Sequence, residues 1–211
     1  MSRWTFYTAP ATCALATHIA LHEAGADFEL VKLDFAAQQQ QGAAYLAINP
    51  KGRVPALVTA QGAITETPAL LLFVAQSFPA AQLAPLQDAF AMARVNELLG
   101  YLVSTVHVNH AHGRRASRWA DAPDAQAAMR AKVPQTMTAC AALLEQGLAA
   151  AGGPWALGAA YSVADAYLYS VASWLEGDGV DTSAFPLLLA HRARMAQRPA
   201  VQRALAEAAA A

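Results

Sequence analysis

Residues 49–65 of the chain read NPKGRVPALVTAQGAIT, and this stretch decides the fold of the first half. Asn49-Pro50-Lys51-Gly52 has the composition of a turn. The segment Val54–Thr59, rich in β-branched residues, predicts a strand, Gln61-Gly62 a hairpin turn, and residues 63–65 a further strand. Because the connection is so short, we expect these two strands to be antiparallel neighbours in one sheet.

Elements on either side of this hairpin complete a small α/β unit. Trp4–Tyr7 is aromatic and favours a strand, and Thr12 can cap the helix that follows it. Phe28–Leu33 predicts a second strand, which the crossover helix makes parallel to the first. A short helix over residues 43–47 and a longer one over Ala69–Ser77 give the order βαβαββα. We therefore expect a mixed four-stranded sheet with helices packed on it.

The second half of the chain has no strand signal. Residues 78–87 are rich in Pro and Ala and are typical of a linker. The expected helices run from Asp88 to about His112, from Pro123 to about Ala150, over Ala164–Leu175 behind a Ser162–Asp165 capping box, and over 187–197 and 199–209. The fold class is thus α/β plus all-α, with an α/β domain over 1–78, a linker over 79–87 and a helical bundle over 88–211.

Composition and charge exclude several classes of protein. Hydrophobic residues make up 56% and charged residues 14% of the chain, so it is not intrinsically disordered. The formal net charge of −1 leaves no basic excess for nucleic acid or an anionic membrane surface. No uninterrupted run of about 20 apolar residues predicts a membrane span. His18, His22 and Glu23 break the stretch that a signal peptide would need, so we expect a cytoplasmic protein.

The two cysteines differ in their surroundings. Cys13 follows the first strand and stands in the first turn of the first helix, where free N–H groups and the helix dipole favour an anion. There a cysteine can be a reactive thiol with a lowered pKa, or a small buried hydrophobic residue as most free cysteines are. Cys140 lies inside an Ala-rich helix, and we expect it only to pack.

Two further pairs of residues are candidates for ligand binding. At Val54-Pro55, a cis bond would turn the Val54 backbone outward to pair with an extended peptide, whereas a trans bond would make Pro55 a plain edge proline. Glu66-Thr67 precedes a helix and suits an amino-acid head group, since Glu66 can meet an ammonium and Thr67 a carboxylate. The alternative is that both residues only cap the helix.

A histidine-rich segment stands at the end of the first long helix of the bundle. His107 and His110 share one helical face, but His112 does not, and the segment has no Cys, Asp or Glu. We therefore expect no metal site there. His18 and His22 of the first helix are also four residues apart, and we expect them on an exposed or half-buried face.

The quoted stretch and four others together resemble one family. They are residues 6–25 (FYTAPATCALATHIALHEAG), 45–57 (YLAINPKGRVPAL), 65–70 (TETPAL), 163–168 (VADAYL) and 197–201 (QRPAV). In this combination they are similar to bacterial beta-class glutathione transferases over nearly the whole chain. The resemblance implies a thioredoxin-like N-terminal domain, a helical C-terminal domain, a homodimer, and glutathione as co-substrate at the domain junction.

The resemblance also implies roles for single residues. Cys13 and His107 would be the catalytic residues beside the glutathione sulfur. The glutathione-binding residues would be Gln38, Arg53, Val54, Pro55, Glu66 and Thr67, with Val54 pairing with the tripeptide backbone through a cis bond to Pro55. Trp174 would face the second substrate, a hydrophobic electrophile, or would pack in the core as the tryptophans are expected to do as a group. The implied activity is conjugation of glutathione to such electrophiles, as in detoxification.

Some positions depart from the family pattern. Gln38 and Val108 stand where the family has lysines, so each removes a positive charge near an anionic ligand. Binding is then weaker unless other basic residues compensate, the candidates being Arg53, Arg114, Arg115 and Arg118. Two other functions stay open. One is glutathione-dependent reduction of disulfides through Cys13, and the other is non-catalytic binding of glutathione or a hydrophobic ligand.

Overall fold

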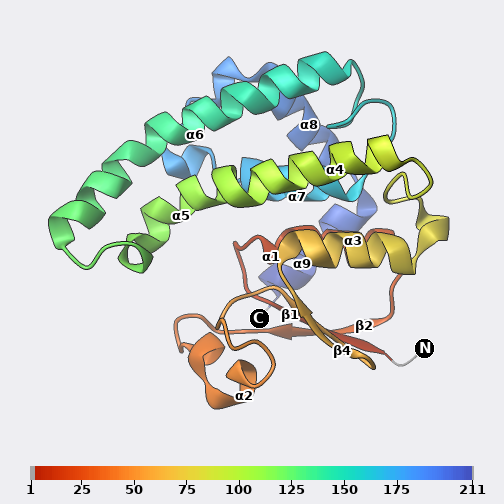
Figure 1. Cartoon of the computed structure of the whole chain (residues 1–211), viewed down its shortest axis with the longest axis horizontal. Coiled ribbons are helices and arrows are strands. Elements are labelled where there is room, and N and C mark those ends of the chain that lie inside the picture. Colours follow the sequence, from red (N-terminus) through yellow and green to blue (C-terminus); the bar gives the residue numbers. More distant parts are fainter. Residues whose placement is uncertain (1–2, 211) are drawn as a thin grey trace.

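The structure, a computed structural model, describes residues 3–210. A sheet forms one end of the molecule, and the long helices of the second half lie beyond the helices that cover it (Figure 1). The strands are β1 (Trp4–Thr8), β2 (Phe28–Lys32), β3 (Ala56–Thr59) and β4 (Gly62–Thr65), in the spatial order β2-β1-β3-β4. Strand β1 is parallel to β2 and antiparallel to β3, which is antiparallel to β4. The predicted thioredoxin-like arrangement is confirmed.

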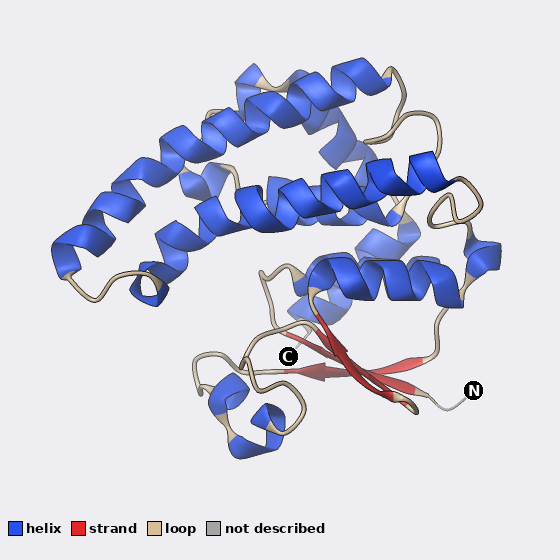
Figure 2. Cartoon of the chain, in the orientation of Figure 1, coloured by secondary structure: helices blue, strands red, loops and turns tan. Residues whose placement is uncertain are grey.

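The strand register explains how the sheet is covered on both faces. Phe6 pairs with Leu57, and Tyr7 pairs with Ala56. Since neighbouring residues of a strand point to opposite faces, Phe6 and Leu57 enter the main core, whereas Tyr7 and Ala56 belong to a smaller cluster on the other face. Helices α1 (Ala14–Glu23) and α3 (Thr67–Ser77) cover the first face, and α2 (Ala43–Leu46) lies at the second (Figure 2).

Two local details of this half differ from the sequence predictions. Strand β3 begins at Ala56 rather than Val54, because Pro55 has no N–H to contribute to the ladder. The bond between Val54 and Pro55 is cis. Thr12 does not cap α1, since its Oγ1 donates to the Ala9 carbonyl at 2.7 Å, and Cys13 takes the N-cap position.

The second half is helical, as predicted. Its helices are α4 (Ala89–Tyr101), α5 (His107–Arg115), α6 (Pro123–Ala151), α7 (Val163–Ala172), α8 (Pro186–Ala196) and α9 (Pro199–Ala209). The single helix expected from Asp88 consists of α4, a π-helical turn over Leu102–Val106, and α5. The Asp88 carboxylate caps it by accepting the Ala91 N–H at 3.0 Å. Across residues 3–210, none of the helices combines the length and apolarity needed to cross a membrane.

Helix α7 forms the centre of the bundle, and a buried carboxylate fixes its start. Every residue of α7 is buried. Asp165 completes the predicted capping box by accepting the Ser162 N–H at 2.8 Å. The same carboxylate accepts the Ala156 N–H at 2.7 Å and lies 2.9 Å from His191 Nε2 on α8. Asp165 therefore ties the loop before α7 to two helices.

Helix α9 returns to the first half and packs against α1. His18 and His22 on α1 place their Nε2 atoms 2.8 and 2.9 Å from the same oxygen of Glu207 on α9. His18 is fully buried and His22 partly so, which corrects the expectation of an exposed or half-buried face for His18. The expectation failed because the partner helix lies almost two hundred residues away in sequence.

Candidate active site

A cleft of about 960 Å³ separates the two halves of the molecule. Its first wall comes from three loops at one end of the sheet, which contribute Pro10–Cys13, Gly52–Pro55 and Glu66-Thr67. Its second wall comes from the helical half, with Val103, His107, His110, Arg114, Arg118, Tyr167 and Trp174. The volume lies at the upper end of the range of about 300–1,000 Å³ typical of small-molecule sites. The cleft is therefore large enough for a small-molecule ligand.

Much of the second wall comes from α5 and the π-helical turn before it. Lining residues at 103, 107, 110 and 114 are three or four positions apart, which is the spacing of one helical face, and Arg118 follows in a separate 3-10 turn. The π-helical turn interrupts the ordinary repeat between the first two of these positions. Such turns are frequent at functional sites because the extra residue re-aims the side chains that follow.

Cys13 is a protonated thiol in this cleft. Its side chain is only 7% exposed, and its Sγ lies 3.8 Å from the Val54 carbonyl oxygen. Burial raises the pKa of Cys13 to about 11, and the hydrogen bond with Thr67 only partly opposes this. Burial therefore opposes the lowering of the Cys13 pKa that the helix start favours. Desolvation of the thiolate outweighs the favourable helix dipole.

Two side-chain hydrogen bonds fix the loop that carries Val54. The Arg53 carbonyl oxygen accepts hydrogen bonds from the Tyr45 hydroxyl at 2.6 Å and from the Asn49 side chain at 2.5 Å. Among residues 3–210, the Val54 N–H donates to no other group. Of the two isomers considered for the Val54-Pro55 bond, the structure has the cis form. Val54 lines the cleft, so its backbone N–H is available to a ligand there.

Glu66 and Thr67 adjoin an open helix start. Glu66 stands at the N-cap position of α3 with φ of 77°, a conformation that costs a residue with a Cβ about 1–3 kcal/mol. Strained positions of this kind are typical of ligand sites. Thr67 lies in the first turn and does not cap it, so the prediction that Thr67 caps α3 is wrong. The carboxylate of Glu66 forms an ion pair with the ammonium group of Lys51.

His107 is a neutral residue on the second wall. Its Nδ1 lies 3.0 Å from the Tyr167 hydroxyl. Burial lowers the pKa of His107 to about 4, and the charges of His110 and Arg118 act in the same direction. His107 is therefore uncharged at neutral pH. Tyr167, which the sequence did not single out as a site residue, is fully buried and still lines the cleft.

Four arginines give the cleft a positive lining: Arg53, Arg114, Arg115 and Arg118. Within the described part of the chain, none of them pairs with a carboxylate within 4.0 Å. Their charge is therefore free for an anionic ligand. Gln38 is exposed and does not line the cleft, in contrast to the expectation, and Gln40 and Gln41 line it instead.

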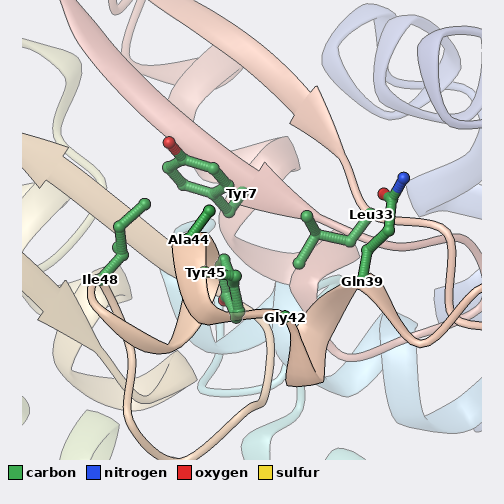
Figure 3. Close-up of a pocket in the computed structure, with 7 residues that line it drawn as sticks. All are labelled: Tyr7, Leu33, Gln39, Gly42, Ala44, Tyr45 and Ile48. Atoms are coloured by element: carbon green, nitrogen blue, oxygen red, sulfur yellow. The ribbon is translucent and has the colours of Figure 1, made fainter.

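A second cavity of about 340 Å³ lies on the α2 side of the sheet (Figure 3). Its walls are Tyr7, Leu33, Gln39, Gly42, Ala44, Tyr45 and Ile48. These residues are mostly apolar and overlap with the smaller core cluster. They include none of the arginines, histidines or the thiol of the main cleft, so we place the chemistry in the main cleft.

Comparisons with known proteins agree along the whole chain. Residues 2–76 match the family model described as "Glutathione S-transferase, N-terminal domain", and residues 109–208 match "Glutathione S-transferase, C-terminal domain". The chain is 32% identical over 199 residues to glutathione S-transferase GstA of Escherichia coli O157:H7, covering 93% of this chain and 94% of that protein.

Solved structures give the same result. A glutathione transferase homolog from Sulfitobacter, crystallised with bound glutathione, is 43% identical with a TM-score of 0.93, covering 98% of this chain and 99% of that one. A sphingomonad glutathione S-transferase complexed with glutathione is 37% identical, with a TM-score of 0.86 and coverage of 98% and 100%. A bacterial beta class enzyme from Sphingomonas chungbukensis is 33% identical, with a TM-score of 0.85 and coverage of 97% and 98%.

Proposed function

The chain belongs to the glutathione S-transferase family, and from this premise we propose that it transfers glutathione to hydrophobic electrophiles in the cleft between its halves. Glutathione is its co-substrate. The observation that carries the proposal is the cleft itself. It combines a buried thiol at the start of α1, unpaired arginines, and an available strand backbone within one cavity.

The groups of glutathione match those of the first wall one by one. The γ-glutamyl head carries an ammonium for Glu66 and a carboxylate for Thr67 and the open N–H groups of α3. The central cysteinyl residue pairs with the Val54 backbone beside Pro55, as an added strand would. The glycine carboxylate pairs with Arg53. Gln38 stays outside this set.

In this pose the sulfur of glutathione lies beside Cys13. A neutral Cys13 can donate its S–H to the bound thiolate, and the positive lining around Arg118 favours the same negative charge. The thiol of glutathione releases its proton to solvent, and the thiolate attacks the electrophile. His107 is neutral and can donate or accept a hydrogen bond near the reacting sulfur. Catalysis is then thiolate stabilisation combined with positioning of the two substrates.

The second wall suits an apolar second substrate. Trp174 and Val103 line it together with Tyr167. These side chains provide the aromatic and aliphatic surface that hydrophobic ligands bind. Conjugation of hydrophobic electrophiles in this half of the cleft corresponds to detoxification.

We further propose that the protein works as a homodimer in the cytoplasm. Phe90 on α4 is 77% exposed, which is unusual for a large apolar side chain and fits a partner subunit. Both cysteines are free thiols, as expected in a reducing compartment. Light scattering of the wild type and Phe90→Glu tests the dimer, since the variant should be monomeric if α4 is the interface.

Reduction of disulfides through Cys13 is the second candidate function, because Cys13 faces the cleft. It requires a thiolate, and the raised pKa of Cys13 disfavours this form at neutral pH. The two functions separate in one experiment. Glutathione binding is measured by calorimetry, and conjugation of chlorodinitrobenzene and reduction of a glutathione mixed disulfide are assayed for the wild type, Cys13→Ala and the matched control Cys140→Ala.

We expect the wild type to bind glutathione and conjugate it, and Cys13→Ala to retain part of the conjugation. Cys140 is buried in α6 outside the cleft, so Cys140→Ala should behave as the wild type. Disulfide reduction that is lost in Cys13→Ala alone, without conjugation by the wild type, would favour the second candidate. Binding without either reaction would leave a non-catalytic binding protein.

A further inference from the structure

A histidine–aspartate pair lies at the cleft, and the proposed reaction gives this pair no role. His110 stands on α5, and Asp178 stands in the short 3-10 turn Glu176–Asp178 after α7. His110 Nδ1 lies 2.8 Å from Oδ2 and 3.0 Å from Oδ1 of Asp178. The imidazole also stacks on Trp174, with ring centroids 4.2 Å apart and planes inclined by 21°. The ring of His110 is therefore fixed on two sides.

The pair is not explained by packing. The Asp178 side chain is only 4% exposed, and among residues 3–210 its carboxylate has no hydrogen-bond partner other than His110. A buried carboxylate is unfavourable unless it is paired. Apolar side chains of similar size often stabilise such a position as well as or better than an ion pair. The pair is therefore better explained by a role for the imidazole.

The geometry leaves one nitrogen of His110 free. With Nδ1 facing the carboxylate, only Nε2 remains to interact. Within the described residues Nε2 makes no hydrogen bond, and it is not one of the buried polar atoms without a partner, so it is open to solvent. His110 lines the cleft on the wall that faces Cys13. His107, one turn earlier, differs because its Nδ1 is bound to a neutral tyrosine hydroxyl.

We propose that Nε2 of His110 is a proton donor to second substrates whose adduct must be protonated, such as α,β-unsaturated carbonyl compounds, and that Asp178 positions it. The inference rests on the proposed transferase function and assigns a proton donor and a positioning residue to it. A buried carboxylate on Nδ1 fixes the ring and balances the positive charge that the ring carries when Nε2 is protonated. Such a pair is a general acid–base device in other active sites.

The chemistry of this class requires a proton at the electrophile. The thiolate of glutathione attacks the β-carbon, a C–S bond forms, and the electrons of the double bond move to the carbonyl oxygen as an enolate. His110 Nε2–H donates its proton to this enolate, which becomes the saturated carbonyl product. The imidazole is reprotonated from solvent by the proton that the glutathione thiol released. In contrast, a chlorinated nitroarene loses chloride and needs no proton from the enzyme.

The test compares the two electrophiles in the same variants. Benzylideneacetone is the unsaturated carbonyl, and chlorodinitrobenzene is the substrate that needs no proton. His110→Phe keeps an aromatic ring against Trp174 but removes both nitrogens. Since it leaves Asp178 buried without a partner, the double variant His110→Phe/Asp178→Asn is measured as well. Asp178→Asn alone tests the positioning role.

We expect kcat for benzylideneacetone to fall about 100-fold in all three variants, the usual size of a general-acid contribution, with KM little changed. Turnover of chlorodinitrobenzene should fall by a much smaller factor, because that reaction takes no proton from the enzyme. His112→Phe is the matched control, because this histidine is on the same helix, packs against Trp119 and does not line the cleft. It should leave both rates unchanged.

Equal losses on both electrophiles, or no loss on benzylideneacetone, would overturn the role of His110. Loss in His110→Phe without loss in Asp178→Asn would overturn the positioning role of Asp178. If the wild type conjugates chlorodinitrobenzene but not benzylideneacetone, the proton-donor role is wrong and the transferase function stands. If it conjugates neither, the proposed function fails and this inference fails with it.

Discussion

Acidification should weaken the fold through one buried histidine. His18 is fully buried on α1, its Nε2 is bound to Glu207, and its Nδ1 has no partner within the described residues. Burial lowers the pKa of His18 to about 4, and the charge of His22 adds to this, although the hydrogen bond with Glu207 opposes both. In the unfolded chain the pKa of a histidine is about 6.5.

The direction in which stability changes with pH follows from these two pKa values. As the pH falls from about 6.5 to about 4, the unfolded chain takes up a proton at this position and the folded chain does not, so stability falls with the pH. The difference of about 2.5 pKa units corresponds to about 3 kcal/mol in total, of which about 2 kcal/mol is lost between about pH 7.5 and about pH 5.

Urea unfolding followed by tryptophan fluorescence measures this loss. His18→Phe keeps an aromatic ring beside Phe6 and Phe28 but cannot take up a proton. The variant will be less stable at pH values near neutrality, because a hydrogen bond to Glu207 is gone. Its loss of stability between the two pH values should nevertheless be about 2 kcal/mol smaller than that of the wild type. An equal pH dependence in the two proteins would refute the reasoning.

Three other predictions concern the bundle and the cleft. Asp165→Ala should lower the free energy of unfolding by about 3–5 kcal/mol, because it leaves buried donors on Ser162, Ala156 and His191 unpaired, and urea unfolding at neutral pH checks this. Arg118→Ala should weaken glutathione binding about tenfold in calorimetry, and an unchanged Kd would mean that its charge does not reach the ligand. Cys13→Ala should shift the pH dependence of kcat/KM for chlorodinitrobenzene upward by about one pH unit, because one hydrogen bond to the thiolate is worth about 1.4 kcal/mol. Abolished activity at every pH would instead indicate that Cys13 acts covalently.

Local patterns in the sequence were sufficient to predict the elements and their order. The hairpin around Gln61-Gly62, the Asp88 cap and the Ser162–Asp165 capping box all depend on residues close together in the chain. Such patterns indicate which nearby backbone groups form hydrogen bonds with one another. They therefore predicted the mixed sheet and the helical half.

Properties that depend on burial or on distant partners were not predictable in the same way. The raised pKa of Cys13 comes from desolvation by burial, which the position of Cys13 at a helix start does not reveal. Asp178 lies 68 residues from His110 in sequence, so the residues around His110 could not predict this pairing. The contact of Tyr167 with His107 was not predictable for the same reason, since the two residues are 60 positions apart in sequence.

The most direct measurement of the central claim is a crystal structure of the protein with bound glutathione. The account predicts that the glutathione sulfur lies within about 4 Å of Cys13 Sγ, a hydrogen-bond distance for sulfur, with the tripeptide backbone paired to Val54. Glutathione bound in the cavity beside α2, or in the cleft with its sulfur far from Cys13, would contradict the account.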